Sequence, residues 1–187
     1  MKLRLLVSVL AIGSTMSVLA QQPRGAREAL DGMASQHASH TSFTFDKDML
    51  QAAGGDESGG PYQRAVAALN SITFEAFRYH EPAFYIPESM ASLVAAYDRA
   101  GWKHLIDQRG ASPRDNTTPH KQMTDLWLHF NGAEIDDVTV LVRGPKEMNL
   151  IEVSGALRPL DLVHLSGHFG IPKVDPGAVM VPAAPGK

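Results

Sequence analysis

The chain contains no cysteine among its 187 residues. No disulfide can therefore staple the fold, and the hydrophobic core has to stabilise it alone. The same absence excludes a lipid anchor attached through an N-terminal cysteine. A chain of this length is long enough to bury a core of ordinary size, which favours one domain.

An excess of positive charge is also missing, because the formal net charge is −3. Removal of residues 1–20 would take away Lys2 and Arg4 and no acid, so the remaining chain would carry −5. Nucleic-acid binding calls for a basic face, and attachment to an anionic membrane calls for a polybasic cluster. We therefore expect neither nucleic acid nor a membrane surface as a partner.

Long apolar runs are absent except at the start of the chain. There, Lys2 and Arg4 precede an apolar stretch of about sixteen residues that ends at Ala20. A membrane-spanning helix needs roughly 20 apolar residues, whereas a basic start, a short apolar run and a small residue are typical of a secretory signal peptide. The sequence predicts cleavage after Ala20, a periplasmic or secreted protein, and no stable membrane anchor after cleavage.

The usual signatures of catalysis are lacking as well. Ser154 precedes Gly155, but Glu152 stands where a nucleophile elbow needs glycine. The glycine-rich stretch 54–60 has no lysine that would make it a phosphate-binding loop. The sequence therefore predicts no cofactor, and it favours a protein that is not an enzyme.

The apolar pattern predicts the fold class. Met90, Leu93, Val94 and Tyr97 recur at helical spacing after Pro87, which indicates a helix that ends near residue 101. Strands are expected at 41–45, 71–80, 102–108, 126–130, 138–142 and 148–153, and further helices at 46–50, 61–69 and 159–165. Consecutive strands joined by tight turns pair antiparallel. We expect an α+β domain with an antiparallel or mixed sheet and helices packed on one face.

Composition divides the chain into four segments. Residues 1–20 are the predicted signal peptide, and residues 21–40 have little periodicity, which is typical of a flexible lead-in. The single α+β domain is expected over residues 41–171. Residues 172–187 contain four prolines and are predicted to be disordered.

Two histidines have the spacing of metal ligands. His164 and His168 lie four residues apart on the predicted last helix, but Leu165 stands where the zinc-protease pattern needs glutamate. They are the metal candidates that the sequence offers. Because it offers no third ligand, we predict no metal site.

The turn at Asn131-Gly132 separates two other groups of polar residues. His129 is expected to point outward beside Asp125 on the strand before the turn. The acidic residues Glu134, Asp136 and Asp137 follow it and lack the spacing of a calcium loop, so they are expected to form a solvated turn.

The stretch 96–106 carries a resemblance to a known family. Its helix ends in Ala100-Gly101-Trp102 and leads directly into a strand, and three strands, Gly155 and a closing helix follow. This order resembles the domain-of-unknown-function 4252 family of bacterial exported proteins, which are often lipoproteins. The resemblance covers residues 41–171 and implies an α+β domain outside the cytoplasm, with no assigned activity and a link to envelope stress. This chain differs in lacking the lipid-attachment cysteine.

These observations lead to two functional hypotheses. The first is an exported, non-enzymatic binding or envelope-stress-related module with an envelope protein as partner. Trp127 points away from Leu126 and Leu128, so it lies either on a contact surface or under a second packed layer. The alternative is a metal-dependent or hydrolytic enzyme in which polar residues converge, namely His80, Glu81, His129, His164 and His168.

Overall fold

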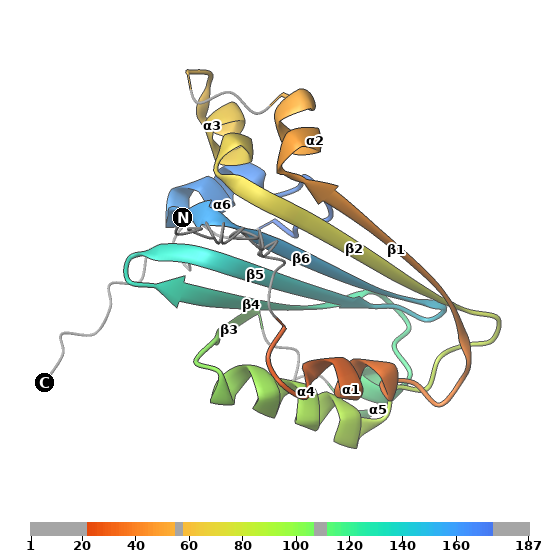
Figure 1. The fold of residues 1–187 in the computed structure, drawn as a ribbon. Helices are drawn as coiled ribbons and strands as arrows, with labels where there is room; N and C mark the ends of the chain where they lie inside the picture. Colours follow the sequence, from red (N-terminus) through yellow and green to blue (C-terminus); the bar gives the residue numbers. More distant parts are fainter. Residues whose placement is uncertain (1–21, 55–57, 107–111, 174–187) are drawn as a thin grey trace, which may run out of the picture.

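A six-stranded antiparallel sheet forms the centre of the protein (Figure 1). The computed structural model describes residues 22–54, 58–106 and 112–173. The elements follow in the order α1 (Ala26–Asp31), β1 (Ala38–Asp46), α2 (Lys47–Ala52), α3 (Pro61–Ala67), β2 (Leu69–Tyr79), α4 (Pro87–Arg99), β3 (Lys103–Ile106), α5 (Pro113–Thr117), β4 (Met123–Asn131), β5 (Glu134–Arg143), β6 (Glu147–Leu157) and α6 (Pro159–Leu165). Across the sheet the strand order is β1-β2-β6-β5-β4-β3.

The predicted fold class is confirmed. The expected strands and helices occur in the expected order, and they form one α+β domain around one antiparallel sheet. The α4 helix shows why its prediction succeeded. It begins at Pro87, buries Leu93, Val94 and Tyr97 along one stripe, and ends before Gly101, whose φ of 83° is the left-handed conformation that terminates a helix.

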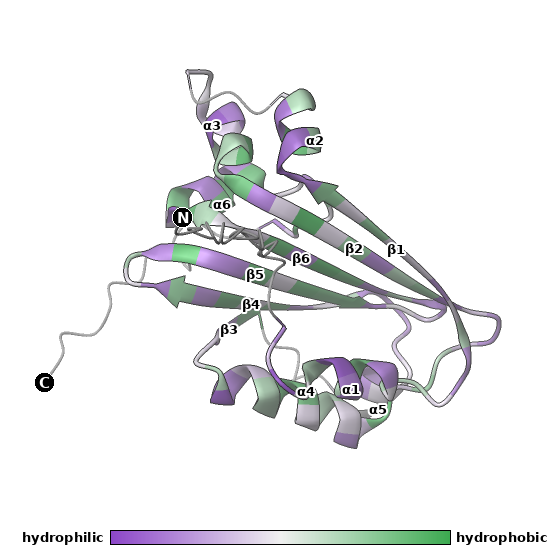
Figure 2. Cartoon of the chain, in the orientation of Figure 1, coloured by the Kyte–Doolittle hydropathy of each residue, from purple (hydrophilic) through white to green (hydrophobic). Residues whose placement is uncertain are grey.

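Helices pack on both faces of the sheet, whereas the sequence predicted one face. On β6, Ile151 and Val153 lie in the hydrophobic cluster of α2, α3 and α6, while Met148 and Leu150 lie in the cluster of α1 and α4. Figure 2 shows hydrophobic residues along the central strands between these two layers. The physical reason is that neighbouring positions such as 150 and 151 are both apolar, so each face of the strand needs a cover. None of the helices in the described ranges has the length and apolar character needed to span a membrane.

The predicted flexible lead-in contains ordered structure. Within residues 22–40 the chain forms α1 and the start of β1. Ala26, Leu30 and Met33 are 0%, 2% and 0% exposed, because this short helix packs against α4. Tertiary packing of this kind stabilises a helix that is too short to be stable alone. The signal peptide predicted at 1–20 and the tail beyond 173 lie outside the described residues.

Trp127 is buried under a second layer and does not form a contact surface. Its side chain is 0% exposed. The indole ring lies between the rings of Tyr97 and His104, at centroid distances of 4.8 and 4.4 Å. This aromatic stack packs α4 against its face of the sheet.

Candidate functional site

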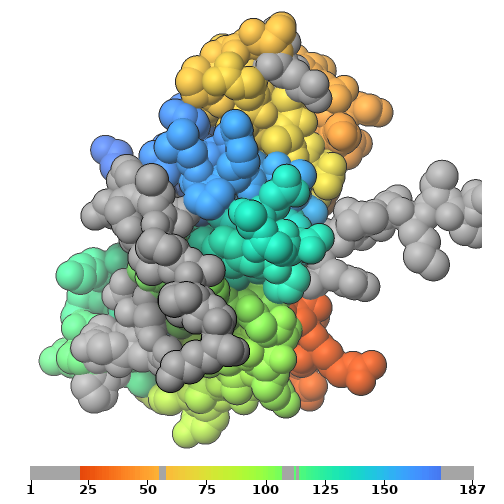
Figure 3. Space-filling view, turned by 90° about the vertical axis from the view of Figure 1, so that its left-hand side faces the viewer, coloured from red at the N-terminus to blue at the C-terminus, as the bar shows by residue number. Residues whose placement is uncertain are grey.

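A hollow of about 680 Å³ opens beside the hairpin that joins β4 to β5, on the sheet face that carries α1 and α4. Figure 3 views the molecule from the side on which this hairpin lies between α6 and α4. The segment before α1, the region after α4 and the two hairpin strands line the hollow with Gln22, Pro23, Arg24, Ala100, Trp102, His129, Asp136 and Asp137. The hairpin contributes the three residues with the strongest ligand chemistry.

An extra residue in β5 gathers these three side chains. His129 lies opposite Asp137 and Phe130 lies opposite Ile135, so Asp136 has no counterpart on β4. A bulge of this kind locally redirects side chains. As a result Asp136 also reaches His129, whose Nδ1 donates a hydrogen bond to Asp136 Oδ1 at 2.6 Å.

The ionised carboxylate of Asp137 is unfavourable in its present surroundings. Burial raises the pKa of its carboxyl to about 6, although a hydrogen bond from Ser154 opposes this rise, and the negative charge of Asp136 raises the pKa further. Its Oδ1 atom is buried and accepts no hydrogen bond within the described residues. An acceptor in this state gains free energy from a cation or a donor that reaches it.

Glu152 on β6 continues the acidic character across the sheet. Its side chain is 7% exposed, and burial raises its pKa to about 7. A hydrogen bond from Gln22 opposes this rise, while the charge of Glu75 adds to it. Two neighbouring strands, β5 and β6, therefore carry carboxylates that are costly to ionise.

Glu75 on β2, at the other end of this row, has cationic and hydrogen-bonding partners within the protein. Arg27 Nη1 donates to both carboxylate oxygens at 2.7 and 2.8 Å, and His40 Nε2 donates to Oε2 at 2.7 Å. The His40 ring stacks on Phe77 at a centroid distance of 4.5 Å. This end of the row is a completed ion-pair network that needs no ligand.

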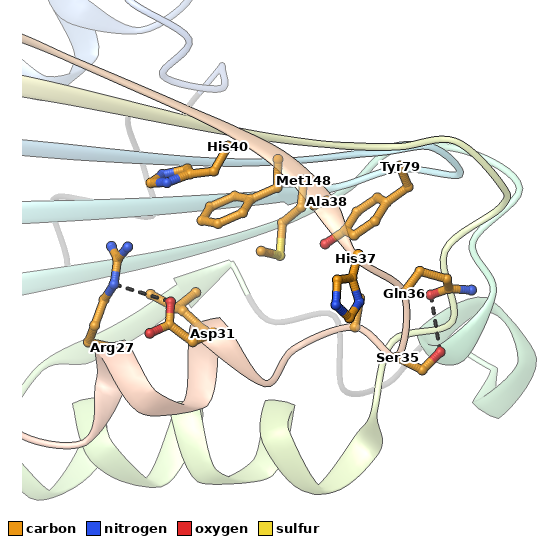
Figure 4. A pocket seen from close by; sticks show the side chains of 12 residues that line it. Arg27, Asp31, Ser35, Gln36, His37, Ala38, His40, Tyr79 and Met148 are labelled. Atoms are coloured by element: carbon orange, nitrogen blue, oxygen red, sulfur yellow. Dashed lines mark hydrogen bonds and ion pairs between the residues drawn. The ribbon is translucent and has the colours of Figure 1, made fainter.

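A second hollow, of about 420 Å³, lies between α1 and the β1–β2 pair (Figure 4). Arg27 and Asp31 project toward it from α1, where they form an ion pair of 3.3 Å between Nε and Oδ1. Tyr79 and Met148 face them from the sheet. Because its arginine is already held by Asp31 and by Glu75, this hollow offers less chemistry than the first.

The first hollow has the donor set of a cation site. One ligand atom each from His129, Asp136 and Asp137 lie within 4.8 Å of one another, and no other group of three or more such residues occurs within the described ranges. An imidazole nitrogen and two carboxylate oxygens suit a divalent transition metal. Bond lengths of 2.0–2.2 Å would require His129 and Asp136 to exchange their hydrogen bond for metal bonds.

The sequence-based candidates do not assemble into one site. The α6 helix ends at Leu165, so His168 lies beyond it, and its ring packs against Tyr62 at a centroid distance of 4.7 Å. His80 and Glu81 are exposed in the loop after β2. Of the five residues considered for an enzyme, His129 alone belongs to the candidate cation site.

Two predictions about the hairpin require correction. Asp125 is buried and does not accompany His129 at the surface, and Asp137 is half-buried in β5 and is not part of a solvated turn. A turn with Asn131 and Gly132 as its two central residues would place His129 opposite Glu134. In the structure Asn131 itself pairs with Glu134 and a bulge follows, so His129 lies opposite Asp137. The turn motif alone therefore does not predict this contact.

Comparison with protein-family models, with curated proteins and with solved structures found no match. The resemblance to the domain-of-unknown-function 4252 family therefore stays a prediction. A functional assignment has to depend on the residues of the site itself.

Proposed function

We propose that the protein is an exported binding module that holds one divalent transition-metal cation at His129, Asp136 and Asp137. The observation that carries this proposal is the clustering of three ligand atoms within 4.8 Å at the wall of an open hollow. Zinc is the appropriate probe, since it accepts mixed imidazole and carboxylate ligands.

Charge supports a cation as the ligand. Asp136 and Asp137 are adjacent acids, and Glu152 raises the negative charge near Asp137. Among the described residues, no lysine or arginine forms an ion pair with Asp136 or Asp137. A bound cation would relieve their repulsion and would lower the raised pKa of the Asp137 carboxyl.

Zinc titration of the purified, processed protein tests the proposal. The wild type is expected to bind one zinc ion per chain. We expect His129→Ala and Asp137→Asn to weaken binding by roughly 100-fold, because removal of even a supporting group costs 10–100-fold at such sites.

His168→Ala is the matched control. It removes a histidine that the sequence pattern favoured but that lies outside the cluster, so its affinity should equal that of the wild type. Equal zinc affinity in the wild type and in His129→Ala would refute the proposal.

A second candidate function is metal-dependent hydrolysis. Three protein ligands leave one coordination position for water, as in catalytic zinc sites, and the hollow gives a substrate room beside it. The test is a panel of ester, amide and phosphodiester substrates with the zinc-loaded protein. Turnover that Asp137→Asn abolishes would support hydrolysis. Zinc binding without turnover would instead support a binding module that is not an enzyme.

Export is part of the proposal and depends on residues 1–20. N-terminal sequencing of the protein from the extracytoplasmic fraction should give Gln21 as the first residue. Recovery of an intact N-terminus in the cytoplasm would contradict it. The link to envelope stress stays a prediction from the family resemblance.

A further inference from the structure

The two edges of the sheet differ in their protection. Within the described residues the β3 edge has four residues, begins with the exposed Lys103, and changes register between His104 and Ile106. Short length, a lysine and an irregular register are devices that prevent an edge from pairing with another strand. The β3 edge is therefore blocked.

The β1 edge has none of these devices. It runs for nine residues from Ala38 to Asp46, contains no lysine, arginine or proline, and pairs with β2 in nine consecutive positions without a shift. Residues 39–43 are exposed, and Phe43 is 48% exposed. Its outer row of backbone N–H and C=O groups can therefore accept another strand.

We propose that β1 pairs antiparallel with the β1 strand of a second copy of this chain, about a two-fold axis at Ser42. This register places Thr41 opposite Phe43 of the other copy and His40 opposite Thr44. Pairs between aromatic and β-branched residues stabilise antiparallel strands. The two sheets would then form one continuous sheet across a symmetric interface.

The low charge of the strand is compatible with a second copy as the occupant. Asp46 is the one formally charged side chain in β1, and it is the last residue of the strand. In the symmetric register it lies opposite Ala38, so the two carboxylates stand at opposite ends of the interface, roughly 26 Å apart. An almost uncharged strand does not favour an acidic or a basic partner segment. In the symmetric register, by contrast, the contact between Thr41 and Phe43 of the other copy occurs twice.

Sedimentation of the purified protein over a concentration series is the first measurement. A single strand pair is at the small end of stable interfaces, so we expect a dimer that dissociates on dilution. The variant Thr41→Lys/Phe43→Lys places lysines opposite lysines and should be monomeric, with an unchanged circular dichroism spectrum. Thr41→Glu/Phe43→Glu should be monomeric for the same reason, and an equimolar mixture of the two variants should restore the dimer.

Cross-linking tests the register. Because the chain has no cysteine, Ser42→Cys introduces a single thiol, which should form a disulfide-linked dimer on mild oxidation. Ser92→Cys, at an exposed position of α4, is the matched control and should remain uncross-linked at the same concentration.

Three outcomes would overturn the inference: a wild type that is monomeric at all concentrations, a mixture of charge variants that stays monomeric, or equal cross-linking at positions 42 and 92. A monomer whose β1 strand is instead covered by an extended segment of a different protein would count against it in the same way.

Discussion

The β4–β5 pair carries a carboxylate–histidine group at each of its ends. The group at Asp125 is buried and is called the closed group, whereas the group at His129 borders the hollow and is called the open group. At one end, Asp125 accepts hydrogen bonds from His104 Nε2 at 3.1 Å and from Arg143 Nη2 at 3.2 Å. These side chains are 0%, 5% and 1% exposed. At the other end, the side chains of His129 and Asp136 are 34% and 36% exposed beside the hollow.

The difference is the presence of an arginine. Arg143 neutralises Asp125 and lies over the ring of Tyr85 at 5.6 Å, so the charge of the closed group is balanced within the protein. Arg143 Nε is buried and donates no hydrogen bond within the described residues. The open group has two aspartates and one histidine, and its Asp137 has a raised pKa. A completed group stabilises the fold, whereas an incomplete group at an open hollow has the capacity to bind.

Breaking the closed group should give the largest effect. Arg143→Met leaves the Asp125 carboxylate buried without its cation, and we expect a loss of about 3–5 kcal/mol in the free energy of unfolding. Urea denaturation measures it. The double variant Asp125→Leu/Arg143→Met removes both charges and should recover most of the loss. An unchanged stability of Arg143→Met would show that the ion pair does not stabilise this end.

Completing the open group with zinc should give the next largest effect. A ligand at 100 times its dissociation constant stabilises the native state by about 2.7 kcal/mol. Thermal denaturation should therefore show a higher Tm with zinc, and a chelator should reverse the increase. His40→Ala, which alters the Glu75 end of the carboxylate row, should keep the increase, and Asp136→Asn should lose it. A zinc-dependent increase in Asp136→Asn would place the ion elsewhere.

The sequence predicted the parts of this comparison that depend on local pattern. The α4 stripe around Leu93 and Tyr97 and the turn at Asn131-Gly132 are each visible within a few residues, and each is confirmed. The strand at 126–130 is also confirmed, but the expected half-buried alternation is wrong, because residues 125–128 are all buried. Apolar residues also occur on both faces of the predicted strands. Trp127 shares its face with the polar residues Asp125 and His129, so the sequence left open whether a second layer covers that face.

The site required information that no short window contains. His129 and Asp137 meet through strand register and a bulge. Glu152 lies on a third strand, opposite Thr139, and interacts with Asp137 through its charge. Arg143 is far along the chain from Asn116, whose carbonyl oxygen accepts its hydrogen bond. Which carboxylate is neutralised therefore follows from tertiary contacts, and so does the distinction between the closed and the open group.

The pH dependence of stability tests whether the acids near the hollow are uncompensated. The pKa of Glu152 is raised from 4.5 to about 7, so the unfolded chain releases this proton first as the pH rises. The contribution of the protonated carboxyl is fully present below about pH 4 and is lost as the pH rises through 7. Glu152→Gln should therefore be more stable than the wild type at pH 8, by about 3 kcal/mol, and equal to it at pH 4.

Glu134→Gln, at an exposed position of β5, is the control for this profile and should follow the wild type at both pH values. Urea denaturation at pH 4, 6 and 8 gives the three curves. A Glu152→Gln profile parallel to that of the wild type would mean that a cation already compensates this carboxyl.

The smallest effect on stability is expected at His129 itself. Its hydrogen bond to Asp136 joins two side chains that are each about one-third exposed, and exposed pairs of this kind contribute roughly 0–1 kcal/mol. Without metal, His129→Gln should therefore unfold within about 1 kcal/mol of the wild type, while its zinc affinity should fall strongly. This separation distinguishes a binding group from a structural one, because in the closed group stability and side-chain contacts are lost together. A large loss of stability in metal-free His129→Gln would make His129 a structural residue, and the two ends of the β4–β5 pair would then be alike.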